Sequence, residues 1–354
     1  MKNTVRKWKI VLPVMLGAAL LLGGCGSSTS DSTADTAESA ASSETESSGE
    51  LTTVRIGCTS ATAQLTDAAL LAQNLGYLDE ELEAAGYAAE YVGFAGAGPA
   101  INEAFAADEI DYAIYAEFPA MTATSNSVDI TVIGTVNSEN NYALLVTDES
   151  GITSGADMEG KKIIVTSGTI LYKYFADLCD EYGIDPNDVD QVAALSDAQS
   201  VLQSGEADGL IITLAAATYY EEIGLGTVVE DTTEQLELAS GMVIAGSSEF
   251  VDANAEANKA ILRAIKRAAE FAEENPDEVY AYLLTDSSTE TSLEAAYGYD
   301  TSFSYFSPEI TDAYLERAQS VLDFASDNGL LGSEEVSLDE LFDSTYVDEV
   351  MAED

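Results

Sequence analysis

From residue 51 onward, short apolar runs alternate with longer stretches in which apolar residues recur at helical spacing. Gly76 and Gly86 fall where the first two helices should end, since glycine readily adopts the left-handed conformation of a helix C-cap. This alternation is typical of a parallel sheet with helices on its faces. The predicted strands are 54–58, 87–94, 111–115 and 130–136, and the predicted helices are 67–74, 78–85, 99–107 and 119–125.

A second set of similar design follows, with strands at 162–165, 191–195 and 209–213 and helices at 170–182 and 198–204. The apolar strands 141–146 and 241–245 flank this set and should carry the chain between two lobes. The rest is helical, and its long run 254–275 should end at the Asn275-Pro276 step. We therefore expect an α/β fold of two lobes with a hinge and a cleft, where the strands' carboxyl ends bind ligands. The predicted divisions are 51–143 for the first part of lobe 1, 144–243 for lobe 2 and 244–354 for the return to lobe 1.

The first fifty residues carry a different pattern. An apolar run over residues 10–22 is too short to span a bilayer but fits a signal peptide, here residues 1–24. Leu22-Gly23-Gly24-Cys25 resembles the bacterial lipobox, which implies cleavage before Cys25 and a lipid on that residue. An ordinary signal peptide with an incidental cysteine is the alternative. Residues 25–50 lack aromatic and large aliphatic side chains, so we expect a disordered tether.

Composition excludes several functions. The formal charge is −51, which opposes binding to nucleic acid and to anionic lipid head groups. The chain has no histidine, so histidine-dependent hydrolase sites and histidine metal ligands are impossible. Apart from Cys25 the only cysteines are Cys58 and Cys179, too few for a zinc site and, in our interpretation, in different lobes. We expect no enzymatic activity, no metal and no cofactor.

Several segments, taken in order, are similar to one protein family. Residues 157–165, Asp-Met-Glu-Gly-Lys-Lys-Ile-Ile-Val, run into a Thr-Ser-Gly-Thr loop at 166–169. This resembles the second-lobe opening of ABC-transporter substrate-binding proteins of the sulfonate, taurine, nitrate and thiamine-pyrimidine-precursor type. Segments 75–87, 198–208 and 322–343 agree, so the resemblance covers nearly all of residues 51–350.

The resemblance implies a periplasmic-binding-protein-like type II fold that captures a small organic anion or zwitterion, for example a sulfonate. It also implies a monomer that delivers this ligand to an ABC permease. The lipid on Cys25 would hold the protein at the extracytoplasmic face of the cell membrane. The same scaffold could instead bind a pyrimidine or another heterocyclic vitamin precursor. A membrane-anchored sensor or adhesion module is a further alternative. A related branch makes the thiamine pyrimidine, but that chemistry depends on histidine.

The binding site can also be built from the residues themselves. Strand ends at 58, 94, 115 and 165 each run into a loop that precedes a helix, so four helix N-termini could direct free N–H groups at an anion. None of these loops contains lysine or arginine, which leaves backbone and hydroxyl donors. The candidate ligand-binding residues are Thr59, Ser60, Gln64, Gly96, Glu117, Phe118, Asn141, Tyr142, Ser167, Gly168, Thr169 and Thr213.

Some of these residues have a plain structural alternative. Thr59 and Ser60 could be helix N-caps, Gly96 could only permit a tight turn, and Tyr142 could be a core residue. Glu117 would bear on the ligand, because a carboxylate in the cleft favours a ligand that carries an amine, such as an aminosulfonate, or a hydrogen-bonding heterocycle.

Overall fold

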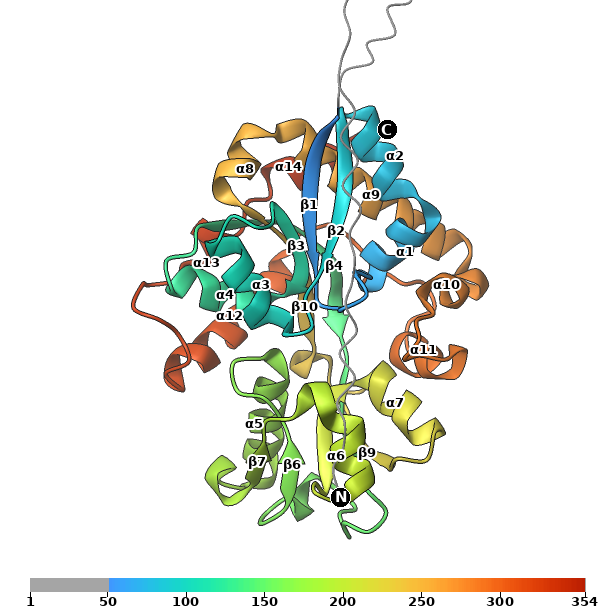
Figure 1. Ribbon diagram of the computed structural model, residues 1–354, viewed down its shortest axis with the longest axis vertical. Coiled ribbons are helices and arrows are strands. Elements are labelled where there is room, and N and C mark those ends of the chain that lie inside the picture. Colours follow the sequence, from blue (N-terminus) through green and yellow to red (C-terminus); the bar gives the residue numbers. More distant parts are fainter. Residues whose placement is uncertain (1–50, 354) are drawn as a thin grey trace, which may run out of the picture. The chain divides into compact units, whose positions relative to one another are not determined.

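The computed structural model describes residues 51–353 (Figure 1). The predicted signal peptide, Cys25 and the tether lie outside the described residues. Two five-stranded sheets form the framework. The first has the order β2-β1-β3-β10-β4, with β1 Thr52–Cys58, β2 Tyr87–Gly93, β3 Tyr112–Ala116, β4 Ile130–Asn140 and β10 Ser240–Ser247. The second has the order β7-β6-β8-β5-β9, with β5 Tyr142–Val146, β6 Lys162–Ile164, β7 Asp190–Val192, β8 Gly209–Thr213 and β9 Thr227–Asp231.

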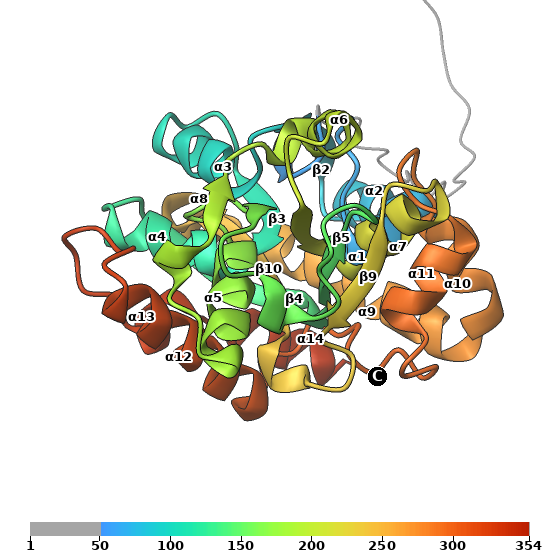
Figure 2. The same ribbon diagram turned by 90° about the horizontal axis from the view of Figure 1, so that it is seen from below.

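Helices follow the strands in both halves of the molecule, where a half means one of the two sheets together with the helices that pack on it. The first sheet carries α1 Asp67–Leu75, α2 Tyr77–Ala84, α3 Ala97–Ala106 and α4 Glu117–Ser125, and the second carries α5 Ile170–Tyr182, α6 Ala198–Ser204 and α7 Leu214–Glu222. After β10 the chain is helical: α8 Ser248–Ala253, α9 Ala255–Glu274, α10 Pro276–Leu283, α11 Glu290–Tyr297, α12 Asp312–Asp327, α13 Leu338–Leu341 and α14 Thr345–Met351. Contacts join the halves on two sides, where α11 packs against α7 and α4 approaches α5 (Figure 2).

The α/β fold class is confirmed, but the sheets are mixed and not parallel as we predicted. β10 runs antiparallel to β3 and β4, and β5 runs antiparallel to β8 and β9. Each of these two strands enters its sheet from the other half of the molecule, at the edge where the parallel strands end. A strand that starts at that edge must run against its neighbours. The pattern of apolar residues shows that a strand exists but not its direction.

The chain crosses between the sheets twice. The first crossing lies between the end of β4 at Asn140 and the start of β5 at Tyr142. The second lies between the end of β9 at Asp231 and the start of β10 at Ser240. The boundaries that we predicted at 143 and 243 therefore fall inside β5 and β10.

Two elements of the second half were missing from the sequence prediction, α7 and β9. Only Leu214 and Ala217 of α7 are buried, so no wide apolar stripe marks this helix in the sequence. The predicted strand 191–195 is also shorter in the structure, because β7 ends at Val192 and a 3-10 turn follows at Leu195–Asp197.

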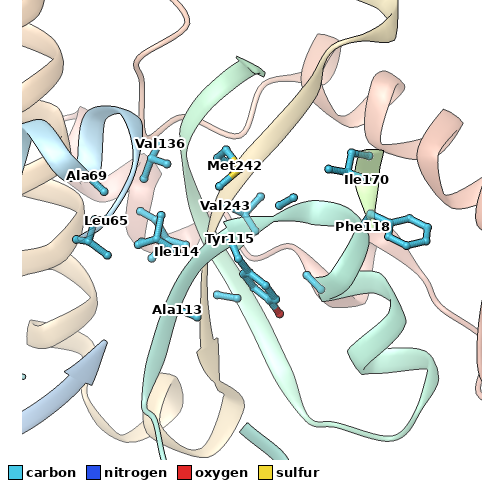
Figure 3. Packing of buried hydrophobic residues seen from close by; sticks show 14 of the residues in the cluster. Leu65, Ala69, Ala113, Ile114, Tyr115, Phe118, Val136, Ile170, Met242 and Val243 are labelled. Carbon is cyan, nitrogen blue, oxygen red and sulfur yellow. The ribbon is translucent and has the colours of Figure 1, made fainter. Parts of the chain in front are cut away.

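The main core lies on both faces of the first sheet. Alternation along β3 places neighbouring side chains on opposite faces. In Figure 3 the Ile114 side chain lies beside Leu65, whereas the next residue, Tyr115, points away from Leu65. Both Ile114 and Tyr115 are buried. Within residues 51–353, no helix combines the length and the apolarity that crossing a membrane requires.

Candidate ligand-binding site

A pocket of about 300 Å³ lies between the two sheets, near the ends of their strands. Residues from both halves line it, and it lies beside both crossings. The first half contributes Thr59, Thr66, Ala97, Gly98, Pro99, Tyr115, Ala116 and Pro119; the strands next to the crossings contribute Asn140, Tyr142 and Met242; and the second half contributes Gly168, Thr169, Ile170, Leu171, Leu195 and Thr213.

The lining contains no charged side chain among the described residues. Its polar side chains are four threonines, two tyrosines and Asn140, and the remainder are apolar or glycine. Any charge on a ligand must therefore be met by hydroxyl groups and by the backbone.

Five helices begin at this pocket. The N-cap residues of α1, α4, α5 and α7 are Thr66, Ala116, Thr169 and Thr213, and all four line it. The first residues of α3 line it as well. At none of these five N-termini does the N-cap side chain accept a hydrogen bond from a first-turn N–H group. Because first-turn N–H groups lack partners within a helix, five helix N-termini place the positive ends of their dipoles at an uncharged lining. Two of these helices, α1 and α4, also carry a buried carboxyl at their first residue, Asp67 and Glu117.

One glycine determines how closely two of these N-termini approach. A Cβ on Gly98, in the first turn of α3, would lie 2.5 Å from Cβ of Pro119 in α4. Such a contact is far inside van der Waals distance, so only glycine allows α3 and α4 to start side by side here. The close approach shapes the wall of the pocket between β3 and the two helices.

Five of the twelve candidate residues line the pocket: Thr59, Tyr142, Gly168, Thr169 and Thr213. The other seven, Ser60, Gln64, Gly96, Glu117, Phe118, Asn141 and Ser167, do not.

Several of these seven have other partners. The side chains of Ser60 and Gln64 bond to Thr62 within the loop after β1. Asn141 accepts a hydrogen bond from the Thr232 hydroxyl at 2.8 Å. Phe118 is fully buried in the core. The partner of Ser60 and Gln64 is local, whereas that of Asn141 is distant in the sequence and gives no local sign.

Glu117 lies outside the pocket lining. Its Oε2 accepts hydrogen bonds from the backbone N–H of Gly241 at 2.7 Å and from the Tyr314 hydroxyl at 2.6 Å. Burial raises the pKa of this carboxyl from 4.5 to about 7, whereas the hydrogen bonds and the charges of Arg317 and Lys173 lower it. Both hydrogen bonds end on Oε2, and Oε1 is buried without a partner. The argument from Glu117 to an amine-bearing ligand requires this carboxyl to line the pocket, which it does not.

A second buried carboxylate lies at the start of α1, next to the pocket residue Thr66. Asp67 is 2 % exposed, and its Oδ1 accepts hydrogen bonds from Asn137 at 2.8 Å and from the Tyr297 hydroxyl at 2.9 Å. Burial raises its pKa. Asn137 belongs to β4 and Tyr297 to α11, so this carboxylate joins three elements beside the first crossing.

Sequence reasoning missed most of the remaining lining. Tyr115 ends the predicted strand 111–115 and precedes a loop that we did consider, so its position was an available signal. Asn140 is the direct neighbour of the predicted Asn141. The apolar members, for example Met242 and Leu195, carry no signal that separates a pocket wall from a core.

The described residues hold no cluster of three potential metal ligands. Cys58 and Cys179 are buried free cysteines. Burial raises the pKa of each thiol to about 12.

Comparison with solved structures defines the class of the fold. The periplasmic sulfonate-binding protein SsuA from Methylobacillus flagellatus KT is 22% identical, with a TM-score of 0.70 over 85% of this chain and 94% of that chain. The alkanesulfonate-binding protein SsuA from Xanthomonas axonopodis pv. citri, bound to MOPS, is 17% identical, with a TM-score of 0.67 over 83% and 99%. The desulfurization enzyme DSZB is 18% identical, with a TM-score of 0.67 over 85% and 99%. The fold is that of type II periplasmic binding proteins, as predicted.

The family follows from the sequence itself. The family model described as NMT1/THI5 like matches residues 50–279, and the chain belongs to this family. A search of curated proteins gives no match.

Proposed function

We propose that this protein captures a small organic anion or zwitterion of the alkanesulfonate type in the pocket and delivers it to an ABC importer. The observation that carries the proposal is the convergence of five helix N-termini on a pocket without charged side chains. Helix N-termini favour anions through their free N–H groups and their dipoles. The names of the sulfonate-binding neighbours support the same ligand class.

Backbone and hydroxyl donors are sufficient for useful affinity. A micromolar complex requires about 8 kcal/mol. A hydrogen bond to a charged group contributes about 1.5–3 kcal/mol, so three to five such bonds meet this requirement.

The apolar part of the lining favours an organic over an inorganic anion. Ile170, Leu171 and Leu195 contribute aliphatic surface from the second half, and Met242 contributes it from the first sheet. A pocket of about 300 Å³ is also larger than nitrate or sulfate needs. An alkyl chain attached to the anionic group would bury this surface.

We also propose that the protein is a lipid-anchored monomer on the extracytoplasmic face of the membrane. The support is the lipobox-like sequence ending at Cys25 and the tether that follows it. Replacing Cys25 with alanine should release the protein from the membrane fraction, and an unchanged distribution would contradict lipid anchoring.

Binding without catalysis is part of the proposal, although the desulfurization enzyme shares the fold. The chain has no histidine, and neither Cys58 nor Cys179 lines the pocket. Their raised pKa values keep both thiols protonated near neutral pH, and a protonated thiol is a poor nucleophile.

A neutral heterocycle such as a pyrimidine is the second candidate ligand. The specific observation in its favour is the same uncharged lining, which includes the aromatic side chains of Tyr115 and Tyr142. The two candidates differ in whether the ligand's charge matters.

The test is calorimetry and thermal-shift measurement on residues 26–354 with a matched pair, butane-1-sulfonate and the neutral butane-1-sulfonamide. Taurine, MOPS and the hydroxymethylpyrimidine precursor of thiamine complete the panel. We expect the sulfonate to bind and the sulfonamide to bind at least tenfold more weakly. Ligand at 100 times its Kd should add about 2.7 kcal/mol of stability. Binding of the pyrimidine alone would favour the second candidate, and no binding at all would favour a sensor or adhesion module.

A further inference from the structure

Two neighbouring asparagines at the first crossing are placed very differently. Asn141 is 3% exposed, and its amide is committed within the protein. Its Oδ1 accepts a hydrogen bond from the Thr232 hydroxyl at 2.8 Å, and its Nδ2 donates to the carbonyl oxygens of Glu139 and Ala296, both at 3.3 Å. Asn140, the last residue of β4, is half-buried and lines the pocket. Only the second of these two amides is therefore placed where a ligand can reach it.

The strand register directs the Asn140 side chain toward the pocket. Asn140 pairs with Ser240, the first residue of β10, and the side chains of directly paired residues lie on the same face of a sheet. The Ser240 hydroxyl shares a hydrogen bond with the hydroxyl of Tyr142, which lines the pocket. Burial raises the pKa of Tyr142, whereas hydrogen bonding from Ser240 and from the Asn140 amide lowers it, so the amide lies near that engaged hydroxyl. An amide has two N–H donors, and at least one of them remains for a ligand.

An anionic group accepts hydrogen bonds, and few side chains of the lining have a free donor for it. The Thr66 hydroxyl donates to Asp67, and the Thr169 hydroxyl donates to the carbonyl oxygen of Thr166 at 2.7 Å. The Tyr115 hydroxyl is buried out of reach. The remaining polar side chains of the lining are those of Thr59, Asn140 and Thr213. A threonine has one hydroxyl proton, so Asn140 is the member of this set with more than one donor.

We propose that the Asn140 amide donates a hydrogen bond to an oxygen of the ligand's anionic group and contributes to selection of that group. The inference rests on the proposed function, because it requires an oxyanion in this pocket. It places the anionic group beside the first crossing, between the end of β4 and the start of β5. Because Asn140 is half-buried, water can solvate its amide when the pocket is empty, so the free donor costs the unliganded protein little.

The test is calorimetry on residues 26–354 with butane-1-sulfonate and butane-1-sulfonamide, for the wild type, Asn140→Ala and Asn140→Asp. Asn140→Ala removes the donor and should raise the Kd for the sulfonate by about tenfold or more, as expected for loss of a hydrogen bond to a charged group. Asn140→Asp keeps the shape of the side chain but presents a carboxylate, so it should raise this Kd further. Both variants should reduce the preference for sulfonate over sulfonamide.

Two controls separate binding from a change in overall charge and from a structural role. Asn328→Asp adds the same charge at an exposed position outside the lining, and it should leave both Kd values unchanged. In thermal unfolding without ligand, Asn140→Ala should melt close to the wild type. Asn141→Ala should melt much lower, because it breaks three hydrogen bonds of a buried amide. A marked fall in the melting temperature of Asn140→Ala would show a structural role like that of Asn141 and would overturn the inference.

The two proposals fail in different ways. If the wild-type chain binds no sulfonate, the proposed function is wrong and the inference about Asn140 falls with it. If the wild-type chain binds butane-1-sulfonate and Asn140→Ala binds it equally well, only the inference about Asn140 is wrong. Equal weakening of sulfonate and sulfonamide in both Asn140 variants would likewise overturn only this inference, because it would indicate a general distortion of the pocket.

Discussion

Two neighbouring polar regions of this protein are built in opposite ways. The pocket has hydroxyl groups and helix N-termini but no charged side chain among the described residues. Next to it, Asp67 and Glu117 are buried carboxylates, and each accepts two or more hydrogen bonds from the protein. We refer to Asp67 and Glu117 as the crossing carboxylates. The comparison indicates that buried carboxyl groups hold the framework here, whereas the ligand is left to neutral donors.

Each crossing carboxylate lies beside one crossing of the chain. Asp67 binds Asn137 of β4, shortly before the first crossing. Glu117 binds Gly241 of β10, directly after the second crossing. Gly241 has no side chain to obstruct this bond, and a Cβ there would collide with the Glu117 carboxylate and the Tyr314 ring. The two carboxylates thus hold β4 and β10, the strands next to the crossings. Any movement of one half relative to the other would bend the chain at these crossings.

The largest effect should come from removing the first crossing carboxylate. Asp67→Ala leaves the buried donors of Asn137 and Tyr297 unpaired and places alanine at a φ of 56°, so we expect a loss of about 4 kcal/mol in unfolding free energy. Urea unfolding at pH 7 measures it. Asp67→Asn is the control, because asparagine tolerates this backbone conformation and keeps an acceptor, and it should lose much less. Equal stability of wild type and Asp67→Ala would refute the structural role of this carboxylate.

The second crossing carboxylate should make stability depend on pH. The folded-state pKa of Glu117 is about 7, above its ordinary value of 4.5. The folded state therefore holds this proton more tightly, and the contribution is fully present below pH 4.5 and lost as pH rises through 7. Relative to Glu117→Gln, the wild type should lose up to about 3 kcal/mol between pH 4.5 and pH 8.

Unfolding curves of wild type and Glu117→Gln at several pH values measure this difference. Other buried carboxyls, such as Asp67 and Asp177, have raised pKa values as well, but they titrate in both proteins and cancel in the comparison. A constant difference across this pH range would mean that Glu117 titrates normally. Ligand affinity at pH 7 should change little, because Glu117 does not line the pocket.

The smallest effect on stability should come from the pocket itself. Gly98→Ala places a Cβ 2.5 Å from Pro119 and forces α3 and α4 apart, at an expected cost of about 2 kcal/mol. Ligand affinity should fall more than in either carboxylate variant, because the wall next to Tyr115 moves. Gln64→Ala, at a position that does not line the pocket, is the control and should bind as wild type does. Calorimetry with butane-1-sulfonate measures both variants, and unchanged affinity in Gly98→Ala would show that this wall does not contact the ligand.

The amino-acid sequence by itself determined most of the local structure. Helices 170–182 and 198–204 and strand 209–213 have the predicted bounds. Their signals are local: apolar spacing within the element, and glycine at the position after each helix, where Gly183 and Gly205 adopt positive φ. The order of several such segments also resembles that in one family of substrate-binding proteins, and this resemblance indicated the family and the fold.

Only the tertiary structure decided the strand directions, the composition of the pocket and the role of Glu117. Glu117 meets Gly241 and Tyr314, which are far away in the chain. Whether a loop residue faces a pocket, as Thr59 does, or bonds within its own loop, as Ser60 does, depends on which elements pack against it. Local propensity acts over a few residues, whereas these outcomes depend on contacts between segments that folding brings together.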